Sequence, residues 1–401
     1  MKWVCALSTR VSLEAAVQEV VQRVLADLDG LQPDFGLLFV STTFSSDAPR
    51  LLPLLAEQIS IPNLIGCSGG GIIGEGRELE DKPAISLMVG HLPNVAIRTF
   101  NLKDTSVPDL DSPPNSWESL VLVSKSMNPS FIVLGDPFSF PINDFLAGMD
   151  FAYPDSIKVG GLASGGGTNM LFCISDGIPN LFRQGLVGAA LWGDIAIDAV
   201  VAQGCRPIGK TLQISQSDRN IILAIENRPP LEVLQEIVSE LSISDQVLAE
   251  TSLFVGVMMN EFKLQAERGD FLIRNIVGVD PRNGAIAIGD RVRPGQRIQL
   301  HLRDADASAN DLKIALHNYH QRSELVRSTS KPEAALMFSC MGRGERLYGQ
   351  ADFDSGIFLN HFESLPLSGF FCSGEIGPVA NTTFLHGYTS VFGILRSRSD
   401  S

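Results

Sequence analysis

Hydrophobic positions along this chain change their spacing from segment to segment, which predicts a mixture of helices and strands. Between residues 12 and 29 apolar side chains recur every three or four positions, with Ser12 suited to an N-cap and Gly30 to a helix stop. Apolar residues at 36–44 then predict a strand, and a second helical pattern opens at Asp47. The chain is therefore expected to begin with strand, helix and strand units.

A pattern of strand, helix-length spacer, strand and glycine-serine turn occurs three times. The copies span residues 36–71, 130–167 and, more loosely, 335–377. In the first two copies, Gly66 and Gly160 stand 94 residues apart at corresponding turns. The sequence therefore predicts internally repeated strand-helix-strand units, whose turns can offer backbone N–H groups to a small ligand.

The segment 169–226 is rich in strand-like runs, for which we expect an antiparallel sheet. Arg228-Pro-Pro then interrupts the pattern before a periodic helix at 231–241. The remainder mixes strands and helices again, and Asn283-Gly284 is its strongest hairpin signal.

These patterns predict an α/β fold class of the mixed α+β kind, with mixed sheets covered by helices. We expect two domains, residues 1–225 and 226–401.

Composition narrows the possible partners. The 401 residues are 44 % apolar and carry a formal net charge of −14, without a cluster of Lys and Arg. This balance argues against nucleic acid or an anionic membrane as the main partner. The N-terminus does not resemble a secretory signal and no apolar run approaches the ~20 residues of a membrane span, so a cytoplasmic protein without membrane insertion is expected.

Two motifs match known phosphate-binding or metal-binding patterns, but the residues around them argue against both kinds of site. Gly204 to Thr211 matches the phosphate-binding loop Gly-x4-Gly-Lys-Thr, but the following residues alternate like a strand, whereas a phosphate-binding loop needs a helix there. His317, His320 and Glu324 share one side of a predicted helix, yet no fourth ligand accompanies them. We therefore expect neither a nucleotide cofactor nor a metal, and no other cofactor.

The six cysteines are scattered without a Cys-x-x-Cys pair, which excludes the usual zinc-ribbon spacing and makes disulfides improbable in a cytosolic chain. Cys67, Cys340 and Cys372 stand at predicted strand ends beside Gly or Ser. One interpretation is a thiolate nucleophile stabilised by turn amides. The alternatives are a small buried hydrophobe or a turn that only binds a ligand.

Two arginines are candidates for anion binding. Arg343 stands between Gly342 and Gly344, and a guanidinium pairs with a carboxylate through two parallel hydrogen bonds. Its alternative is a surface arginine in a turn. Arg274-Asn275 interrupts an apolar strand and needs a partner, for which Glu375 or Asp304 could serve as an ion pair or as part of a pocket.

Taken together, several of these segments resemble the FIST family. They are residues 64–70, 269–278 and 292–304, together with the pair 340–344 and 369–378. The resemblance spans nearly the whole chain, with an N-terminal FIST domain over about the first 225 residues and a C-terminal FIST domain over the rest. It also implies that Gly204 to Thr211 is a turn.

The resemblance implies a sensory or binding domain in signal transduction that recognises small ligands such as amino acids. The family's motif residues fall on Gly66, Cys67, Ser68, Arg274, Asn275, Cys340, Gly342, Arg343, Gly344, Gly374 and Glu375. Since no output module is recognisable, the resemblance further implies that any signal leaves through a partner protein.

Our leading hypothesis is a cytoplasmic binding protein whose turns converge on a pocket for an amino acid or small carboxylate. The candidate ligand-binding residues are Gly66, Cys67, Ser68, Gly69, Gly160, Ser164, Arg274, Asn275, Cys340, Arg343, Cys372, Ser373 and Glu375. No catalytic residue is required. The alternatives are a cysteine-nucleophile enzyme acting on a small substrate, and a non-enzymatic scaffold or assembly protein.

Overall fold

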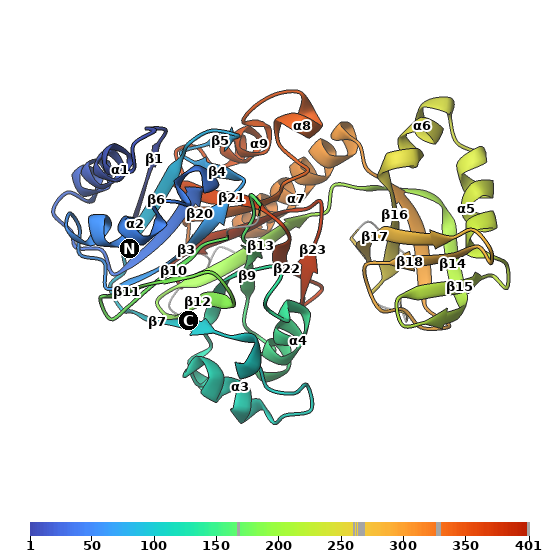
Figure 1. The fold of residues 1–401 in the computed structure, drawn as a ribbon, viewed down its shortest axis with the longest axis horizontal. Helices are drawn as coiled ribbons and strands as arrows, with labels where there is room; N and C mark the ends of the chain where they lie inside the picture. Colours follow the sequence, from blue (N-terminus) through green and yellow to red (C-terminus); the bar gives the residue numbers. More distant parts are fainter. Residues whose placement is uncertain (167–168, 260, 262, 264–268, 326–329, 399–401) are drawn as a thin grey trace. The chain divides into compact units, whose positions relative to one another are not determined.

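The computed structural model describes residues 1–401 except 167–168, 260, 262, 264–268, 326–329 and 399–401. The chain divides into two compact units. Unit 1 consists of Met1–Val201 and Lys313–Ser401, and unit 2 of Ala202–Leu312. Both units combine helices with sheets, so the predicted mixed α/β class is confirmed (Figure 1).

Unit 1 contains three six-stranded sheets. The first has the order β1 (Lys2–Ser8), β6 (Ile85–His91), β2 (Phe35–Ser41), β3 (Asn63–Gly69), β10 (Leu171–Ser175), β11 (Ile178–Phe182). The second has the order β7 (Val95–Leu102), β12 (Leu186–Gly193), β8 (Ser130–Gly135), β9 (Lys158–Leu162), β22 (Glu375–Val379), β23 (Thr382–His386). The third has the order β13 (Ala196–Ala202), β24 (Ser390–Arg396), β20 (Pro332–Cys340), β21 (Leu367–Cys372), β4 (Gly71–Gly74), β5 (Arg77–Glu80).

Each of these sheets has one parallel pair at its centre: β2–β3, β8–β9 and β20–β21. After each pair the chain leaves its sheet and forms a hairpin on another one. Hairpin β4–β5 joins the third sheet, β10–β11 the first and β22–β23 the second. The three sheets are therefore linked in a cycle.

A glycine in each parallel pair allows the strands to approach closely. A Cβ atom would lie 2.1 Å from the Leu38 carbonyl oxygen at Gly66, and 1.8 Å from the Val133 carbonyl oxygen at Gly160. In the third pair, Gly369 would place a Cβ atom 1.8 Å from the carbonyl oxygen of its partner in the register, Met337. No side chain fits at these positions, which explains the glycines in the strand patterns.

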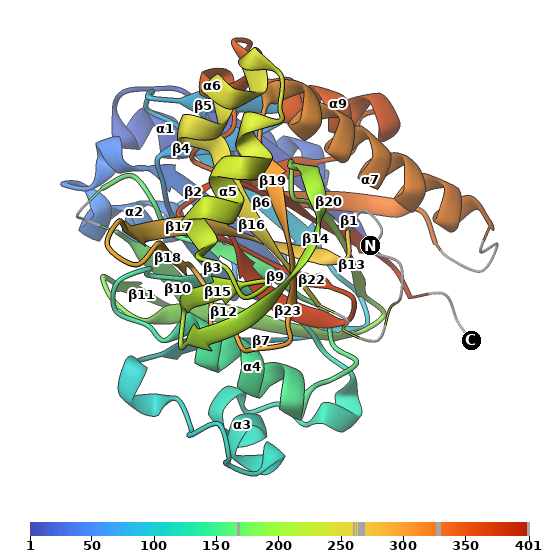
Figure 2. The ribbon, with the colours of Figure 1, turned by 90° about the vertical axis from the view of Figure 1, so that its right-hand side faces the viewer.

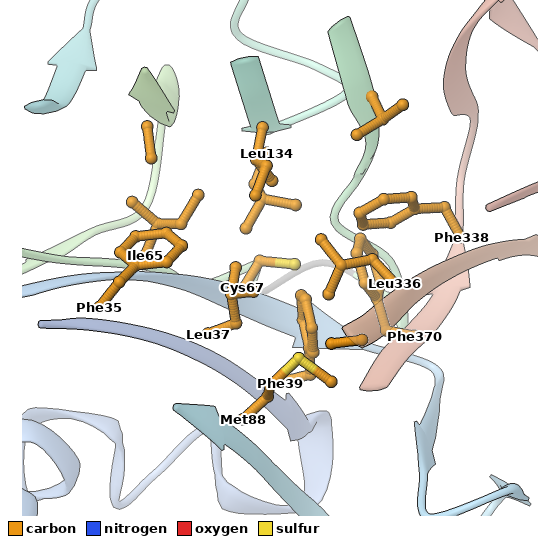
Figure 3. Close-up of a cluster of buried hydrophobic side chains, with 14 of the residues drawn as sticks. Phe35, Leu37, Phe39, Ile65, Cys67, Met88, Leu134, Leu336, Phe338 and Phe370 are labelled. Carbon is orange, nitrogen blue, oxygen red and sulfur yellow. The ribbon is translucent and has the colours of Figure 1, made fainter. Parts of the chain in front are cut away.

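The inner faces of the sheets enclose one hydrophobic core. Figure 3 shows Phe39 and Cys67 of the first sheet, Leu134 of the second, and Phe338 and Phe370 of the third pointing into it. Phe39 and Phe370 stack with ring centroids 5.1 Å apart. Strand alternation places the remaining side chains of the same strands on the outer faces.

Helices cover these outer faces. The bounds in unit 1 are α1 (Leu13–Leu28), η1 (Thr42–Phe44), α2 (Ala48–Ala56), η2 (Asp104–Ser106), α3 (Pro114–Val121), η3 (Lys125–Met127), α4 (Ile142–Ala152), α8 (Glu345–Tyr348) and α9 (Phe353–His361). Helices α1 and α2 pack on the first sheet, and α3 and α4 on the second. Phe358 of α9 stacks on Phe392 of the third sheet. The predicted N-cap of α1 is confirmed, because the Ser12 side chain accepts a hydrogen bond from the Ala15 amide.

Unit 2 is built on a closed barrel (Figure 2). The strand order is β14 (Arg206–Asp218), β15 (Ile221–Ile225), β18 (Ala285–Ile288), β17 (Phe271–Asp280), β16 (Leu253–Met258), β19 (Arg297–Leu302). Helices α5 (Pro230–Ser239) and α6 (Ile243–Ser252) pack against the barrel. Helix α7 (Ala305–Leu325) begins in unit 2 and continues into residues of unit 1.

The compact units do not follow the expected division at residues 225 and 226. That position lies within unit 2, between β15 and α5, because β14 pairs with β19 and β15 with β18. The division into 1–225 and 226–401 stays a prediction about family domains. The single antiparallel sheet expected over 169–226 is wrong, because its strands are distributed over all three sheets of unit 1 and the barrel of unit 2.

Candidate ligand site at the turn cluster

The turns that follow strands β3, β9 and β21 meet in unit 1. We call residues 68–71, 162–166, 340–342 and 371–374 the turn cluster. The Ser164 hydroxyl accepts a hydrogen bond from the Gly70 amide at 2.9 Å and donates one to the Phe371 carbonyl oxygen. The Ser164 amide donates to the Ser68 carbonyl oxygen at 3.3 Å. One serine thus joins three turns that are far apart in the sequence.

Backbone hydrogen bonds complete the turn cluster. The Ser373 amide donates to the Leu162 carbonyl oxygen at 3.0 Å, and the Leu162 amide donates to the Gly374 carbonyl oxygen at 2.8 Å. The Met341 amide donates to the Cys372 carbonyl oxygen at 3.1 Å. The segment after β20 is therefore held against the turn after β21.

Two glycines allow the turns to approach this closely. A Cβ atom at Gly70 would lie 2.5 Å from Cε of Met341, and one at Gly165 would lie 2.5 Å from Cγ2 of Thr42. Gly165 also has a φ of +102°, which L side chains rarely adopt. Thr42 follows β2, so the end of that strand reaches the turn cluster as well.

Part of the turn cluster faces solvent. Gly165, Gly166 and Ser373 are exposed, while Gly70 and Met341 are half-buried. Its accessible groups are backbone amides and carbonyls, hydroxyls and a thioether. Such neutral groups at the carboxyl ends of parallel strands can bind a small polar molecule without activating it.

The cysteines lie below this surface. Cys67 is fully buried among aromatic and aliphatic side chains of the core, and burial raises the pKa of its thiol well above the ordinary value (Figure 3). Burial, followed by the charges of Glu375, Cys67 and Cys340, raises the pKa of Cys372 in the same way. Both thiols are therefore kept protonated, which opposes the nucleophile interpretation. Cys340 is half-buried and stands opposite Cys372 in the parallel pair.

Arg343 is neither a surface arginine nor open to a ligand. Its side chain is completely buried, and Nε and Nη2 donate to the two carboxylate oxygens of Asp354 at 2.6 and 3.0 Å. Nη2 also donates to the Tyr348 hydroxyl at 2.6 Å. The bidentate grip expected for a ligand carboxylate is thus made with α9 of the same chain.

Two protein-family models match this chain. Residues 34–228 match the FIST N domain and residues 230–378 match the FIST C domain.

The chain belongs to the FIST family.

FIST domains are in general sensory domains of signal transduction.

Two curated relatives match nearly the whole chain, and a third matches part of it. An uncharacterised protein of Mycobacterium tuberculosis is 33% identical over 390 residues, covering 96% of this chain and 97% of its own. An uncharacterised Mycobacterium bovis protein is 32% identical and covers 94% of both chains. An F-box/LRR-repeat protein of Arabidopsis thaliana is 27% identical over 46% of this chain and 38% of its own.

Solved structures resemble this FIST protein only weakly. A cyanuric acid hydrolase from A. caulinodans has 8% identity and a TM-score of 0.35, covering 100% of this chain and 99% of its own. PurLQS from Thermotoga maritima has 12% identity and a TM-score of 0.22, covering 98% of this chain and 72% of its own. Likenesses at this level support no inference about chemistry.

The FIST motif residues fall in different surroundings. Ser68 accepts the Met170 amide at its hydroxyl, and Glu375 is buried and accepts the Thr389 amide at 3.1 Å. Arg274 and Asn275 belong to β17 in unit 2, where the Arg274 Nε donates to Asp290 at 2.8 Å. Of the two ion partners proposed for Arg274, Asp304 pairs with Arg206 instead, and Glu375 stays a prediction.

The two rejected motifs lie at the start of β14 and in α7. Lys210 and Thr211 continue strand β14, so no helix follows the phosphate-loop match; the expected turn is an irregularity within that strand, where Gly209 has a φ of +62°. His317 is exposed on α7. Across the described part of the chain, no three His, Cys, Asp or Glu side chains gather so as to hold a metal ion. Nor does any described helix have the length and hydropathy to cross a membrane.

Sequence reasoning missed three polar residues beside the turn cluster: Thr42, Asp136 and Asn169. Asp136 is buried directly after β8, and its carboxylate accepts the Asn169 side-chain amide at 2.7 Å and the Ser139 hydroxyl at 2.5 Å. Thr42 and Asp136 each follow the first strand of a parallel pair. That position, where ligands bind in α/β sheets, was the signal that could have found them.

Proposed function

We propose that this FIST protein is a sensory protein that binds a small polar molecule, of the amino acid or small carboxylate class, at the turn cluster. The observation that carries the proposal is the convergence of three sequence-distant turns on Ser164. Backbone amides and hydroxyls are the groups that would recognise a carboxylate or an amide there. Arg343 positions the segment 340–342 instead of contacting the ligand, and the family's sensory role supports the assignment.

Binding is tested by thermal unfolding of the full chain with each amino acid and with succinate, malate and citrate. A specific ligand at about 100 times its Kd adds roughly 2.7 kcal/mol of stability. Ser373→Ala and Thr42→Val remove accessible hydroxyls at and beside the turn cluster, so each should reduce the shift in Tm caused by the ligand. Ser126→Ala, at an exposed serine of η3, is the matched control.

If no compound stabilises the wild type, or if both variants respond like Ser126→Ala, the proposed site is wrong. Cysteine chemistry is disfavoured by the buried thiols, and the scaffold alternative is separated by the same compounds. A scaffold would capture its partner equally well with and without ligand.

We further propose that signalling proceeds through a partner protein in the cytoplasm. The cysteines are present as thiols, which supports a reducing compartment. By linkage, a ligand that raises the affinity for the partner must itself bind the complex more tightly by the same factor. Pull-down of partners with and without the stabilising compound tests this relationship.

We also propose that unit 1 arose from an internal repeat. The support is that each of the three sheets has its parallel pair at the centre, and that each pair is followed in the chain by a hairpin belonging to another sheet. The close-contact glycines, Gly66, Gly160 and Gly369, stand at corresponding positions of these pairs.

A further inference from the structure

Unit 1 has a cavity of about 510 Å³ outside the turn cluster. It is lined by residues 101–104 at the end of β7, by Ser139 after β8 and by residues 181–186, which connect β11 to β12. This volume is within the range of small-molecule sites. Nothing in the proposed function uses it.

The charges around this cavity favour an anion. Lys103 and Arg183 line it together with one acidic residue, Asp104. The Asp104 carboxylate accepts the Thr105 amide, and Arg183 has a hydrogen bond at 3.4 Å to the Ser45 carbonyl oxygen. Among the described residues, neither cation forms an ion pair. In a chain with a net charge of −14, this is a local excess of positive charge.

The rest of the lining provides hydrogen-bonding groups and an apolar surface. Asn101 and Gln184 contribute side-chain amides that can donate to oxygen, and Ser139 contributes a hydroxyl. The apolar part consists of Leu102, Leu181, Phe182 and Leu186. A ligand with a negatively charged group on an apolar body would match both kinds of surface.

The floor of the cavity is fixed by the backbone. Gly185 has a φ of +88°, and a Cβ atom there would lie 2.2 Å from the Leu102 carbonyl oxygen. Its amide donates to the Ser139 hydroxyl at 2.9 Å, and its carbonyl oxygen accepts the Asp136 amide at 2.8 Å. A site held this way is pre-organised, which lowers the entropic cost of binding.

The same floor connects to the turn cluster by hydrogen bonds. The Ser139 hydroxyl donates to Asp136, whose other carboxylate oxygen accepts from Asn169. The next residue, Met170, donates its amide to the Ser68 hydroxyl at 3.0 Å. The cavity and the turn cluster are therefore connected by these hydrogen bonds and by the peptide link between Asn169 and Met170.

We propose that this cavity is a second ligand site, which binds a small molecule bearing a carboxylate or phosphate group on an apolar body. Lys103 and Arg183 contact the oxyanion, and Phe182 and the leucines contact the body. The site does not depend on ligand binding at the turn cluster, so each proposal can fail while the other stands.

The test is calorimetric titration of the full chain with phenyl phosphate, benzoate and the neutral benzyl alcohol. At least one anion should bind ten-fold or more tightly than benzyl alcohol. The anion that binds more tightly shows whether the site prefers a phosphate or a carboxylate. The double variant Lys103→Gln with Arg183→Gln should weaken binding of that anion at least ten-fold. Lys125→Gln, which removes one positive charge at an exposed lysine of η3, is the control for charge loss outside the cavity and should leave binding unchanged.

Three results would each overturn the proposal: no binding of either anion, equal binding of benzyl alcohol, or full binding by the double variant. A circular dichroism spectrum and Tm like those of the wild type establish that the double variant is folded. Ser373→Ala should leave the affinity of the preferred anion unchanged. That result distinguishes binding at this cavity from binding at the turn cluster.

Discussion

Two polar regions of unit 1 include parts of the segment that follows strand β20, and they differ in charge and in exposure. The turn cluster is built from backbone groups and hydroxyls and partly faces solvent. Beside it, Arg343, Asp354, Tyr348 and Glu78 form a second group, which we call the ion cluster. Arg343 and Asp354 have no exposed side-chain surface, and Glu78 is also buried.

This difference in exposure and charge suits the turn cluster to ligand binding and the ion cluster to structural support. Buried charges that are paired with each other are unavailable to a ligand, but they hold their segments in one place. The Arg343 amide donates to the Cys340 carbonyl oxygen at 2.8 Å, so the ion cluster anchors the segment that carries Met341 against Gly70. Arg343, the residue that the sequence indicated most strongly as an anion ligand, therefore supports the site from below its surface.

The largest expected effect comes from breaking the ion cluster. Asp354→Ala leaves the Arg343 guanidinium buried without its carboxylate and should lower the free energy of unfolding by about 3–5 kcal/mol in urea denaturation. The control is Asp81→Ala, which removes the exposed pair with Arg346 and should cost less than about 1 kcal/mol. Similar losses in the two variants would contradict the supporting role, and the double variant Arg343→Met with Asp354→Leu should recover part of the loss.

The close-contact glycines should show the next largest effect. Gly369→Ala places a Cβ atom against the Met337 carbonyl oxygen, and the resulting backbone shift should cost about 1–3 kcal/mol. Gly278→Ala is the matched control, because the nearest atom to its added Cβ would be the Ala287 Cβ at 3.9 Å. This variant should stay within about 0.5 kcal/mol of the wild type. Equal unfolding midpoints for the two variants would mean that the parallel strands are less closely apposed than described.

Much of the local structure could be predicted from the sequence. Period and capping signals located α1, and the glycine-serine turns indicated the strand ends that meet at Ser164. Sheet membership could not be predicted, because alternation shows which face of a strand is buried but not which strand it pairs with. The hairpins β4–β5, β10–β11 and β22–β23 therefore joined sheets that no local pattern identified.

Side-chain partners were the least predictable feature. The flanking glycines singled out Arg343, but the acid that pairs with it lies on α9, and only the packing of that helix brings Asp354 to the guanidinium. The same limit explains why Asp290 was not recognised as the partner of Arg274. A cysteine between Gly and Ser gives the same sequence pattern in two different situations. Its side chain can face solvent, as a nucleophile would, or face the core, as Cys67 does.

The pH dependence of stability tests the ion cluster without removing the arginine. Burial, and secondly the charge of Asp354, raises the pKa of Glu78 from 4.5 to about 7. Because the folded state then binds the proton more tightly than the unfolded state, Glu78 favours folding below about pH 4.5, and this contribution is lost as the pH rises through 7.

Glu78→Gln should therefore remove a decline of roughly 2.5 kcal/mol in unfolding free energy between pH 5 and 8. Urea unfolding at intervals across this range measures it. Glu57→Gln, at an exposed glutamate after α2, should retain the decline. An unchanged pH profile in Glu78→Gln would show that Glu78 is already ionised in the folded protein near pH 5.

The smallest effect concerns the thiols, and it separates a binding surface from a catalytic one. Iodoacetamide reacts with the thiolate, and burial disfavours that form at Cys67 and Cys372. In the native protein at pH 7, peptide mass spectrometry should find both positions labelled far more slowly than free cysteine, and the half-buried Cys340 labelled sooner. Labelling of either thiol far faster than free cysteine, at a rate that falls when urea unfolds the chain, would restore the nucleophile hypothesis, because only the folded surroundings can activate a cysteine.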